Sequence, residues 1–344
     1  MIGDNMQKQI NKGIWIAALF LMIVLISVIV YRSNNSLKVV TKNIFYMDTQ
    51  IYIKLYGKNE KKLNDALLQV ENLYKEYHQL TDRYQSYDNV INPYYIYHNS
   101  DQSDTLTIDE KLYAVLKLAQ MWHEKNNLFD ITIGNVIDVW KKYREAGTGI
   151  PTEEELASAN NQKKELVLLD DHAIKNNHVS IDLGSVAKGY TTEEAGKLLK
   201  KLGISTYLIN AGGNVIVGDS YNKKDYTIGI EDPTNNQKDI FTVVHGKNIS
   251  VVTSGGYERF YEYNGQKYHH IINPITLYPS SYSKSVTVIT KNSAKADILS
   301  TILFLLPIDE GMSLVESLDD TEAIWYTEDN LIVRSSGMKN YETK

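Results

Sequence analysis

The sequence predicts an α+β protein, in which mixed sheets and flanking helices form a single domain after an N-terminal membrane helix. Three observations support this class. Residues 14–31 carry no charged side chain. Between Asn43 and Gly218, strand-like runs alternate with segments whose apolar residues recur at helical spacing. After Gly218 the chain consists mainly of short strand-like runs separated by Gly, Asn or Pro, which is typical of an antiparallel sheet.

The composition is that of a folded protein with a large core. The chain has 344 residues, of which 43% are hydrophobic, and this is enough for one large domain. Its formal net charge of -6 argues against a nucleic-acid partner, because binding to a phosphate backbone requires a basic patch. The absence of cysteine excludes a disulfide framework, a zinc-cysteine site and a lipid-anchored cysteine.

Residues 14–31 are long enough to cross a membrane as a helix, since a helix rises about 1.5 Å per residue. We therefore expect a single-pass signal-anchor in the cell membrane. Residues 1–13 would be cytoplasmic, residues 32–42 a polar tether, residues 43–336 an extracytoplasmic domain, and residues 337–344 a tail. A cleaved signal peptide is the main alternative, although the small-residue cleavage pattern is missing. The other alternative is that residues 14–31 form a helix buried in the protein core.

The first part of the domain combines a strand with amphipathic helices. Residues 47–57 predict a strand, because Ile51 and Ile53 alternate with polar or amphipathic residues. Residues 59–80 and 109–125 predict helices, the first with a continuous apolar side.

The role of two further segments of this region is less specific. The tyrosines between residues 84 and 97 could stack on a flat aromatic ligand or pack into the core. Residues 152–177 are polar and charged, which indicates a surface excursion.

Residues 179–218 are the centre of the predicted organisation. They predict a strand, a tight turn at Gly184, a helix that stops at Gly203, and a second strand. Such a unit often holds a ligand with phosphates, because the free backbone N–H groups at a helix N-terminus favour anions. Asp182 and Lys188 flank the turn.

The last part of the chain predicts an antiparallel sheet and one buried helix. The helix covers residues 294–306, is densely apolar, and is ended by Pro307. A final hairpin is expected between residues 322 and 334. The other predicted strands are residues 226–231, 241–245, 250–253, 260–263, 268–272 and 286–290.

Oxygen-bearing side chains of the buried helix suggest a metal site. Asp297 and Thr301 lie four residues apart, so their oxygens project from one helix face, and Ser300 is adjacent. Mg²⁺ prefers oxygen ligands of this kind, with phosphates and water completing its shell. The alternative is structural, because threonine hydroxyls often bond to their own helix backbone.

Two histidines are candidates for proton transfer. His269 and His270 are neighbours in a strand-like run, so they should face opposite sides, and at most one can point into a given site. A neutral imidazole can accept a proton from a hydroxyl nucleophile. The nearby loop Thr253 to Phe260 suits a ligand or, equally, a tight β-turn. The signatures of P-loop, Rossmann and zincin enzymes are absent from the sequence.

Taken together, the motifs resemble those of the ApbE family, the FAD:protein FMN transferases, from about Tyr46 to Arg334. The resemblance rests on six blocks in the family's order, and six ordered blocks are far more specific than any one of them. They are MDTQIYIKLYG, FDITIGNVIDVW, SIDLGSVAKGY, LINAGGN, SVVTSGGYERFYEYNGQKYHHIINPIT and SVTVITKNSAKADILSTILFLL.

The resemblance implies an Mg²⁺-dependent enzyme that splits FAD at its pyrophosphate. The FMN half would be attached through a phosphoester to a threonine or serine of an acceptor protein, and AMP would be released. His270 matches the base that deprotonates the acceptor hydroxyl. The metal ligands would be Ser185, Asp297, Ser300 and Thr301. The FAD contacts would be Met47, Val139, Trp140, Asp182, Lys188, Ile271 and Ile272.

Some positions depart from the family pattern. Asn214 replaces an aspartate after two glycines, and Asn273 and Leu277 replace an aspartate and a glycine. These changes should affect how the ligand fits and which acceptor protein is chosen, because the segment with Asp297, Ser300 and Thr301 keeps the family pattern. Two other functions stay open: an FAD pyrophosphatase, in which water replaces the acceptor hydroxyl, and a membrane-tethered FAD-binding protein without catalysis. We expect the acceptor to be membrane-bound or extracytoplasmic, because tethering raises effective concentration.

Overall fold

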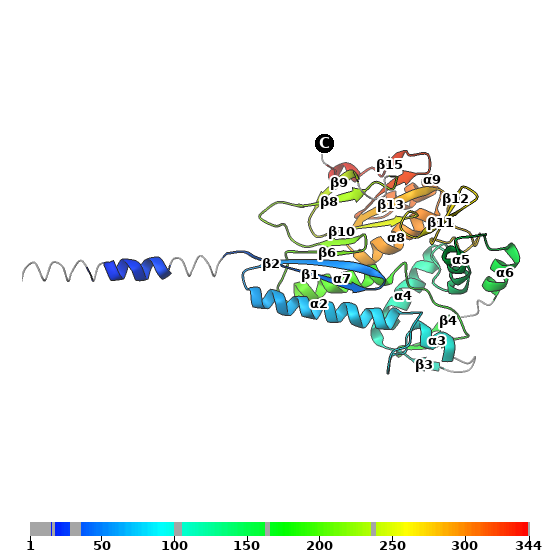
Figure 1. Ribbon diagram of the computed structural model, residues 1–344, viewed down its shortest axis with the longest axis horizontal. Coiled ribbons are helices and arrows are strands. Elements are labelled where there is room, and N and C mark those ends of the chain that lie inside the picture. The colour runs from blue at the N-terminus through cyan, green and yellow to red at the C-terminus, as the bar shows by residue number, and fades with distance from the viewer. Residues whose placement is uncertain are drawn as a thin grey trace, which may run out of the picture.

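The computed structural model describes residues 15, 18–27, 36–99, 105–161, 166–234 and 239–342 (Figure 1). Residues 18–27 form a helix with exposed apolar side chains. The rest of the predicted anchor 14–31, apart from Trp15, and all of residues 1–13 lie outside the described residues. Within the described ranges, no helix combines the length and the apolar content needed to cross a membrane.

An eight-stranded sheet forms the centre of the domain. Its strand order is β1-β2-β6-β7-β10-β13-β14-β15, and every neighbouring pair is antiparallel. In β2, Ile51 and Ile53 are fully buried, as their alternation predicts. The strands are β1 (Lys38–Tyr46), β2 (Thr49–Gly57), β6 (Tyr207–Ala211), β7 (Asn214–Val217), β10 (Ile249–Gly255), β13 (Ser283–Thr290), β14 (Thr321–Thr327) and β15 (Ile332–Arg334).

The first strand, β1, is not among the predicted elements, because the strand expected over residues 47–57 corresponds to β2. β1 begins at Lys38, so residues 38–42, which were expected to be part of the tether, belong to the sheet. They pair with β2 in a continuous antiparallel register from Lys38 opposite Gly57 to Tyr46 opposite Thr49. Ile44 is the only buried residue of this edge strand, so its apolar alternation is too weak to read from the sequence.

Three helices cover one face of the sheet: α2 (Glu60–Thr81), α7 (Ala187–Lys201) and α8 (Ser293–Leu305). Figure 1 shows α2 and α7 together on the same side of β1, β2 and β6. The side chain of Asn59 caps α2 by accepting a hydrogen bond from the Lys62 N–H. Helix α8 is buried almost all round because it lies between α7 and strands β10 and β13.

A hairpin covers part of the opposite face. It consists of β8 (Tyr226–Glu231) and β9 (Ile240–Gly246), and its buried residues pack with Val217 and Val251 of the central sheet. The predicted tail also packs there as far as residue 342, because the 3₁₀ helix η1 (Met338–Asn340) buries Met338 in the same cluster.

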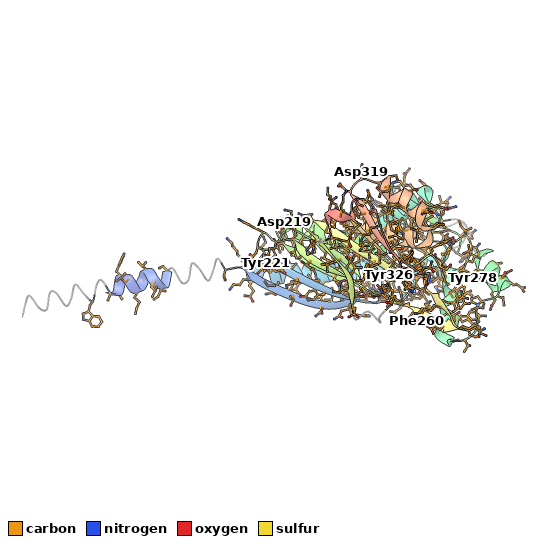
Figure 2. All side chains as sticks on the ribbon, turned by 90° about the horizontal axis from the view of Figure 1, so that it is seen from above. Asp219, Tyr221, Phe260, Tyr278, Asp319 and Tyr326 are labelled. Atoms are coloured by element: carbon orange, nitrogen blue, oxygen red, sulfur yellow. The ribbon has the colours of Figure 1, made fainter. Side chains whose placement is uncertain are left out.

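The remaining elements form the end of the domain farther from the N-terminal segment, where Figure 2 labels Phe260 and Tyr278. There α5 and α6 pack with the β11–β12 hairpin around Trp140. The elements are α3 (Pro93–Asn99), β3 (Thr105–Thr107), α4 (Glu110–Lys125), α5 (Gly134–Ala146), α6 (Glu153–Asn161), β4 (Leu166–Leu168), β5 (Ala173–Asn176), β11 (Phe260–Tyr263), β12 (Gln266–His269) and α9 (Ile308–Glu316).

The predicted mixed class is therefore confirmed, with one local error in its central unit. Residues 179–183 are extended but belong to no sheet of the described chain, and the turn at Gly184 leads directly into α7. Gly203, with φ of 69°, follows the end of this helix as predicted.

Candidate active site

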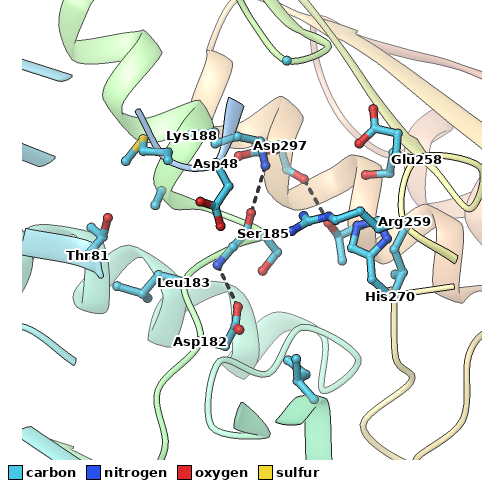
Figure 3. A pocket seen from close by; sticks show the side chains of 18 of the residues that line it. Asp48, Thr81, Asp182, Leu183, Ser185, Lys188, Glu258, Arg259, His270 and Asp297 are labelled. Atoms are coloured by element: carbon cyan, nitrogen blue, oxygen red, sulfur yellow. Dashed lines mark hydrogen bonds between the residues drawn. The ribbon is translucent and has the colours of Figure 1, made fainter. Parts of the chain in front are cut away.

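A cavity of about 440 Å³ opens where α7 and α8 meet the β1–β2 turn and the loops after β10 and β12. This volume is in the range of small-molecule sites, roughly 300–1,000 Å³. Figure 3 shows that its polar side chains come from segments far apart in the sequence. Of the predicted site residues, the cavity is lined by Met47, Asp182, Ser185, Lys188, His270, Ile271, Ile272, Asp297 and Thr301.

Asp297 is a nearly buried carboxylate at the contact between α7 and α8, with 5% of its surface exposed. Its Oδ2 accepts a hydrogen bond of 2.7 Å from the Gly189 N–H. Burial raises the pKa of this carboxyl, while the charge of Lys188 and the Gly189 bond oppose the shift. A carboxylate in such a place gains from a further cation beside it.

The two hydroxyls after Asp297 have different positions. The hydroxyls of Thr301 and Ser300 both donate to the Asp297 carbonyl oxygen, at 3.3 and 2.9 Å. Thr301 lines the cavity, whereas Ser300 is fully buried against Ser254, with 2.8 Å between their Oγ atoms. Successive helical residues are rotated by roughly 100°, so Ser300 points behind the wall that Asp297 and Thr301 share.

Ser185 lies in a turn that is fixed from both sides. The Gly184 N–H donates to Asp182 Oδ1 at 2.9 Å, and Lys188 Nζ donates to the Gly184 carbonyl at 3.2 Å. Both contacts are drawn in Figure 3. The turn therefore presents a serine hydroxyl, an ammonium group and a carboxylate to the same cavity.

Arg83 supports this turn and is not among the site residues predicted from the sequence. Its guanidinium forms two hydrogen bonds with the Asp138 carboxylate, at 2.9 and 2.7 Å. It also donates to Ser180 Oγ at 2.7 Å and lies 3.4 Å from Asp182 Oδ2. Arg83 thus connects the end of α2, helix α5 and the 180–185 segment. No local motif marks it, because its partners are far away in the sequence.

The two histidines face different surroundings, as predicted. His269 is structural: its Nε2 lies 2.8 Å from the Ser280 carbonyl, its ring packs against Phe304, and burial lowers its pKa to about 4. His270 lines the cavity, and its Nδ1 is buried without a hydrogen-bond partner among the described residues. Burial, and then the charge of Arg259, lower the pKa of His270 well below 6.5, so its imidazole is neutral.

The β1–β2 turn contributes an unusual backbone to the cavity. Met47 and Asp48 both have positive φ, 56° and 55°, which is the geometry of a two-residue type I′ turn. Asn and Gly usually occupy such a turn, so Met47 is held there against its own preference. The Met47 N–H donates to His78 Nδ1 at 3.3 Å.

Two predicted FAD contacts do not line the cavity. Trp140 is 1% exposed, its Nε1 donates to the Leu277 carbonyl, and its ring stacks on Tyr268. Val139 packs against the same cluster. From α5 the cavity is instead lined by Ile137 and Arg144, because the helix turns Trp140 toward the β11–β12 hairpin.

Other polar and charged residues complete the lining. Thr253, Glu258 and Arg259 belong to the loop for which the sequence left a ligand role and a β-turn open, and they line the cavity. Figure 3 places Arg259 and His270 on one side and Asp48 and Lys188 on the other. The lining residues that were not predicted from the sequence include Asp48, Thr81, Asp82, Arg83 and Arg144. Of the tyrosine-rich segment, Tyr84 lines the cavity.

The donor set fits a hard cation that arrives with a phosphate ligand. Asp297 offers one carboxylate, and Ser185 and Thr301 offer hydroxyl oxygens to the same cavity. No group of three or more His, Cys, Asp or Glu that could hold a metal occurs in the described part of the chain. Mg²⁺ is typically bound through one or two carboxylates with water and substrate phosphates, so this set suits it better than it suits zinc.

Comparison with known proteins agrees with this architecture. The sequence pattern of the ApbE family matches residues 47–325, a span that contains nearly the whole cavity lining. The chain belongs to the ApbE family. The family resemblance drawn from the six motifs is thus confirmed.

Individual ApbE relatives cover most of the chain. It is 28% identical over 297 residues to an FAD:protein FMN transferase of Klebsiella pneumoniae, covering 84% of this chain and 90% of the relative. An ApbE protein of Thermotoga maritima superposes with a TM-score of 0.79 at 25% identity, covering 89% of this chain and 100% of that one. The flavin transferase ApbE of Vibrio cholerae superposes with a TM-score of 0.75 at 21% identity, covering 89% of this chain and 100% of that one.

Proposed function

We propose that this protein is an FAD:protein FMN transferase, which moves the FMN half of FAD to a serine or threonine of an acceptor protein. One observation carries the proposal: Asp297, Thr301, Ser185 and the neutral His270 line the same cavity. The names of the relatives support it, because FAD:protein FMN transferases of Klebsiella pneumoniae and Treponema pallidum match 84% and 69% of this chain.

The residues that would hold Mg²⁺ are Asp297, Thr301 and Ser185. When bound, such a cation neutralises charge on the phosphate oxygens during phosphoryl transfer. Lys188 adds a positive charge to the same cavity, because its ammonium group is bonded to the Gly184 carbonyl in the turn that precedes α7. Asp182 and Arg83 hold that turn in place, so the cavity keeps its shape before FAD enters.

His270 is suited to accept the acceptor's proton. In the proposed reaction the hydroxyl oxygen attacks the FMN-side phosphorus, the hydroxyl proton moves to the imidazole, and the pyrophosphate P–O bond breaks with AMP as the leaving group. An imidazole that is neutral at physiological pH can accept this proton without first losing another. General-base assistance typically contributes about 10²- to 10⁴-fold.

The test is to incubate the chain with FAD and Mg²⁺, with and without a membrane-protein fraction. We expect AMP release coupled to covalent flavin fluorescence on an acceptor band, with the added mass of FMN on a serine or threonine. Rapid AMP release with free FMN and no labelled protein would instead identify an FAD pyrophosphatase. Tight FAD binding with no AMP release at all would identify a binding protein.

We also propose that residues 14–31 anchor the protein in the cell membrane with the domain outside the cytoplasm. The support is the absence of charge in this segment. An anchored chain stays in the membrane pellet after alkaline carbonate extraction, and its domain is cleaved by protease added to spheroplasts. Release into the supernatant, or protection from the protease, contradicts this location.

A further inference from the structure

A second cavity, also of about 440 Å³, adjoins the candidate active site. The two cavities share three lining residues: Gly212, Thr253 and Glu258. The second one therefore meets the first at the end of β6, at Thr253 of β10 and at Glu258 in the loop after β10. We call it the side groove. It lies on the face of the central sheet opposite α2, α7 and α8.

The floor of the side groove is one row of residues across neighbouring strands. Asn43 of β1 is paired with Tyr52 of β2, which is paired with Asn210 of β6. Val215 of β7 and Val251 of β10 continue the row. Its part nearest the sheet edge is polar and accessible, with Asn43 and Asn210 exposed, so this part of the sheet is not covered by the β8–β9 hairpin.

The wall of the side groove is the backbone edge of β8. Four consecutive residues of this strand, 228–231, line the groove. Neighbouring strand residues point to opposite faces, so a run of four can line one groove only if the strand presents its edge. β8 pairs with β9 alone in the described part of the chain, whereas β9 contacts the chain end on its other side through Val244 and Glu342.

A free strand edge has a specific use in recognition. Its unpaired N–H and C=O groups can pair with an extended segment of another protein, which then becomes an added strand. Four residues of β8 give an edge of roughly 13 Å, enough for a short segment. The amide side chains of Asn43, Gln50 and Asn210 supply further donors and acceptors on the floor.

We propose that the side groove binds the acceptor protein as an extended segment paired with the free edge of β8. The segment delivers its serine or threonine past Gly212, Thr253 and Glu258, the residues common to both cavities, to the cavity lined by His270. This inference rests on the proposed function. It identifies the partner surface as a peptide backbone, which is separate from the residues that hold FAD.

The first experiment fills the groove without touching the active site. Asn43→Trp and Gln50→Trp place a large ring on exposed positions that do not line the main cavity. Val39→Trp is the matched control, because Val39 is 45% exposed on the same face of β1 and does not line the groove. The acceptor probe is a library of short synthetic peptides, each with one central threonine, and the readout is flavin attachment by mass spectrometry.

We expect Asn43→Trp and Gln50→Trp to raise the KM for the best library peptide about tenfold or more, with FAD affinity unchanged. Val39→Trp should behave as the wild-type chain. Wild-type peptide kinetics in both groove variants would overturn the inference and leave the proposed function intact. If the wild-type chain labels no peptide, the result counts against the proposed function, and the inference fails with it.

A second experiment tests the backbone pairing directly. In an added strand, alternate N–H groups of the peptide point toward β8. N-methylation of those amides should abolish labelling, whereas N-methylation of the intervening amides should not. A scan in which losses follow side-chain position, with no alternation, would contradict strand pairing.

Discussion

Gly189 of α7 contacts Asp297 of α8 so closely that its N–H donates to the carboxylate at 2.7 Å. A Cβ added at Gly189 would lie 2.4 Å from the Asp297 Cβ and 2.6 Å from the Ser293 carbonyl oxygen. The absence of a side chain at residue 189 thus sets the position of the candidate metal ligand.

Gly189→Ala should therefore damage both the fold and the site. We expect the free energy of unfolding to fall by about 1–3 kcal/mol, because overpacking at a helix contact forces the backbones apart. The Mg²⁺-dependent rise in melting temperature should shrink as well. Calorimetry with and without Mg²⁺ measures both effects. Gly311→Ala in α9 is the control, since its added Cβ finds no atom nearer than 3.3 Å; equal behaviour of the two variants would contradict this account.

Asp297→Asn should remove metal dependence while keeping the fold. The asparagine side chain keeps an oxygen that can accept the hydrogen bond from the Gly189 N–H. The replacement also removes a carboxyl group whose charged form is disfavoured by burial, so the fold should not be weakened. We expect AMP release to fall by on the order of 10²-fold or more, as for other lost electrostatic groups. Without Mg²⁺ the melting temperature should equal or exceed that of the wild-type chain, and Mg²⁺ should no longer raise it. A variant still stabilised by Mg²⁺ would place the cation elsewhere.

His270→Gln should slow flavin transfer by about 10²- to 10⁴-fold with little change in FAD affinity. The pKa of His270 is lowered by burial and by Arg259, so the wild-type imidazole stays neutral as the pH falls below 6.5. In the wild-type chain, the fall of kcat/KM at acidic pH that is caused by protonation of His270 should therefore occur below pH 6.5. This fall, the acid limb of the pH profile, should be absent from the variant.

His269→Gln is the control for this prediction. Its imidazole packs against Phe304, so its loss should lower the melting temperature. It should leave the position of the acid limb unchanged. If His269→Gln moved that limb and His270→Gln did not, the roles of the two histidines would have to be exchanged.

Arg83→Lys should weaken FAD binding through the 180–185 turn. An ammonium cannot form the paired hydrogen bonds that the guanidinium makes with Asp138 while it also bonds Ser180. We expect the free energy of unfolding to fall by about 1.5–3 kcal/mol and the KM for FAD to rise. Lys61→Gln, which breaks the exposed pair with Asp65, should change stability by no more than about 0.5 kcal/mol. An unchanged KM in Arg83→Lys would limit Arg83 to a structural role.

Elements with a strong local pattern were predictable. Helices α2 and α4 follow their capping residues Asn59 and Asp109, and β8 and β11 have the predicted bounds. Each has a clear period or an end signal within its own residues. β1 was missed because an edge strand with one buried residue shows almost no period.

The site was predictable only in part. Asp297 and Thr301 share a face by helical spacing, so their common exposure to the cavity followed from the sequence. The burial of Ser300 and Trp140 did not, because it depends on which neighbours α8 and α5 pack against. Arg83 could not be found at all, since its contacts with Ser180 and Asp182 join segments nearly a hundred residues apart.

The sequence by itself determined the family, the mixed class and the helices of the sheet layer, and it named the candidate oxygen donors. Tertiary structure decided which candidate donors meet in one cavity, which histidine faces it, and that an edge of β8 left unpaired in the described part of the chain lies beside it. The physical reason is the range of the interactions. Period and capping act within a few residues, whereas the contact of Gly189 with Asp297 exists only once α7 and α8 have packed together.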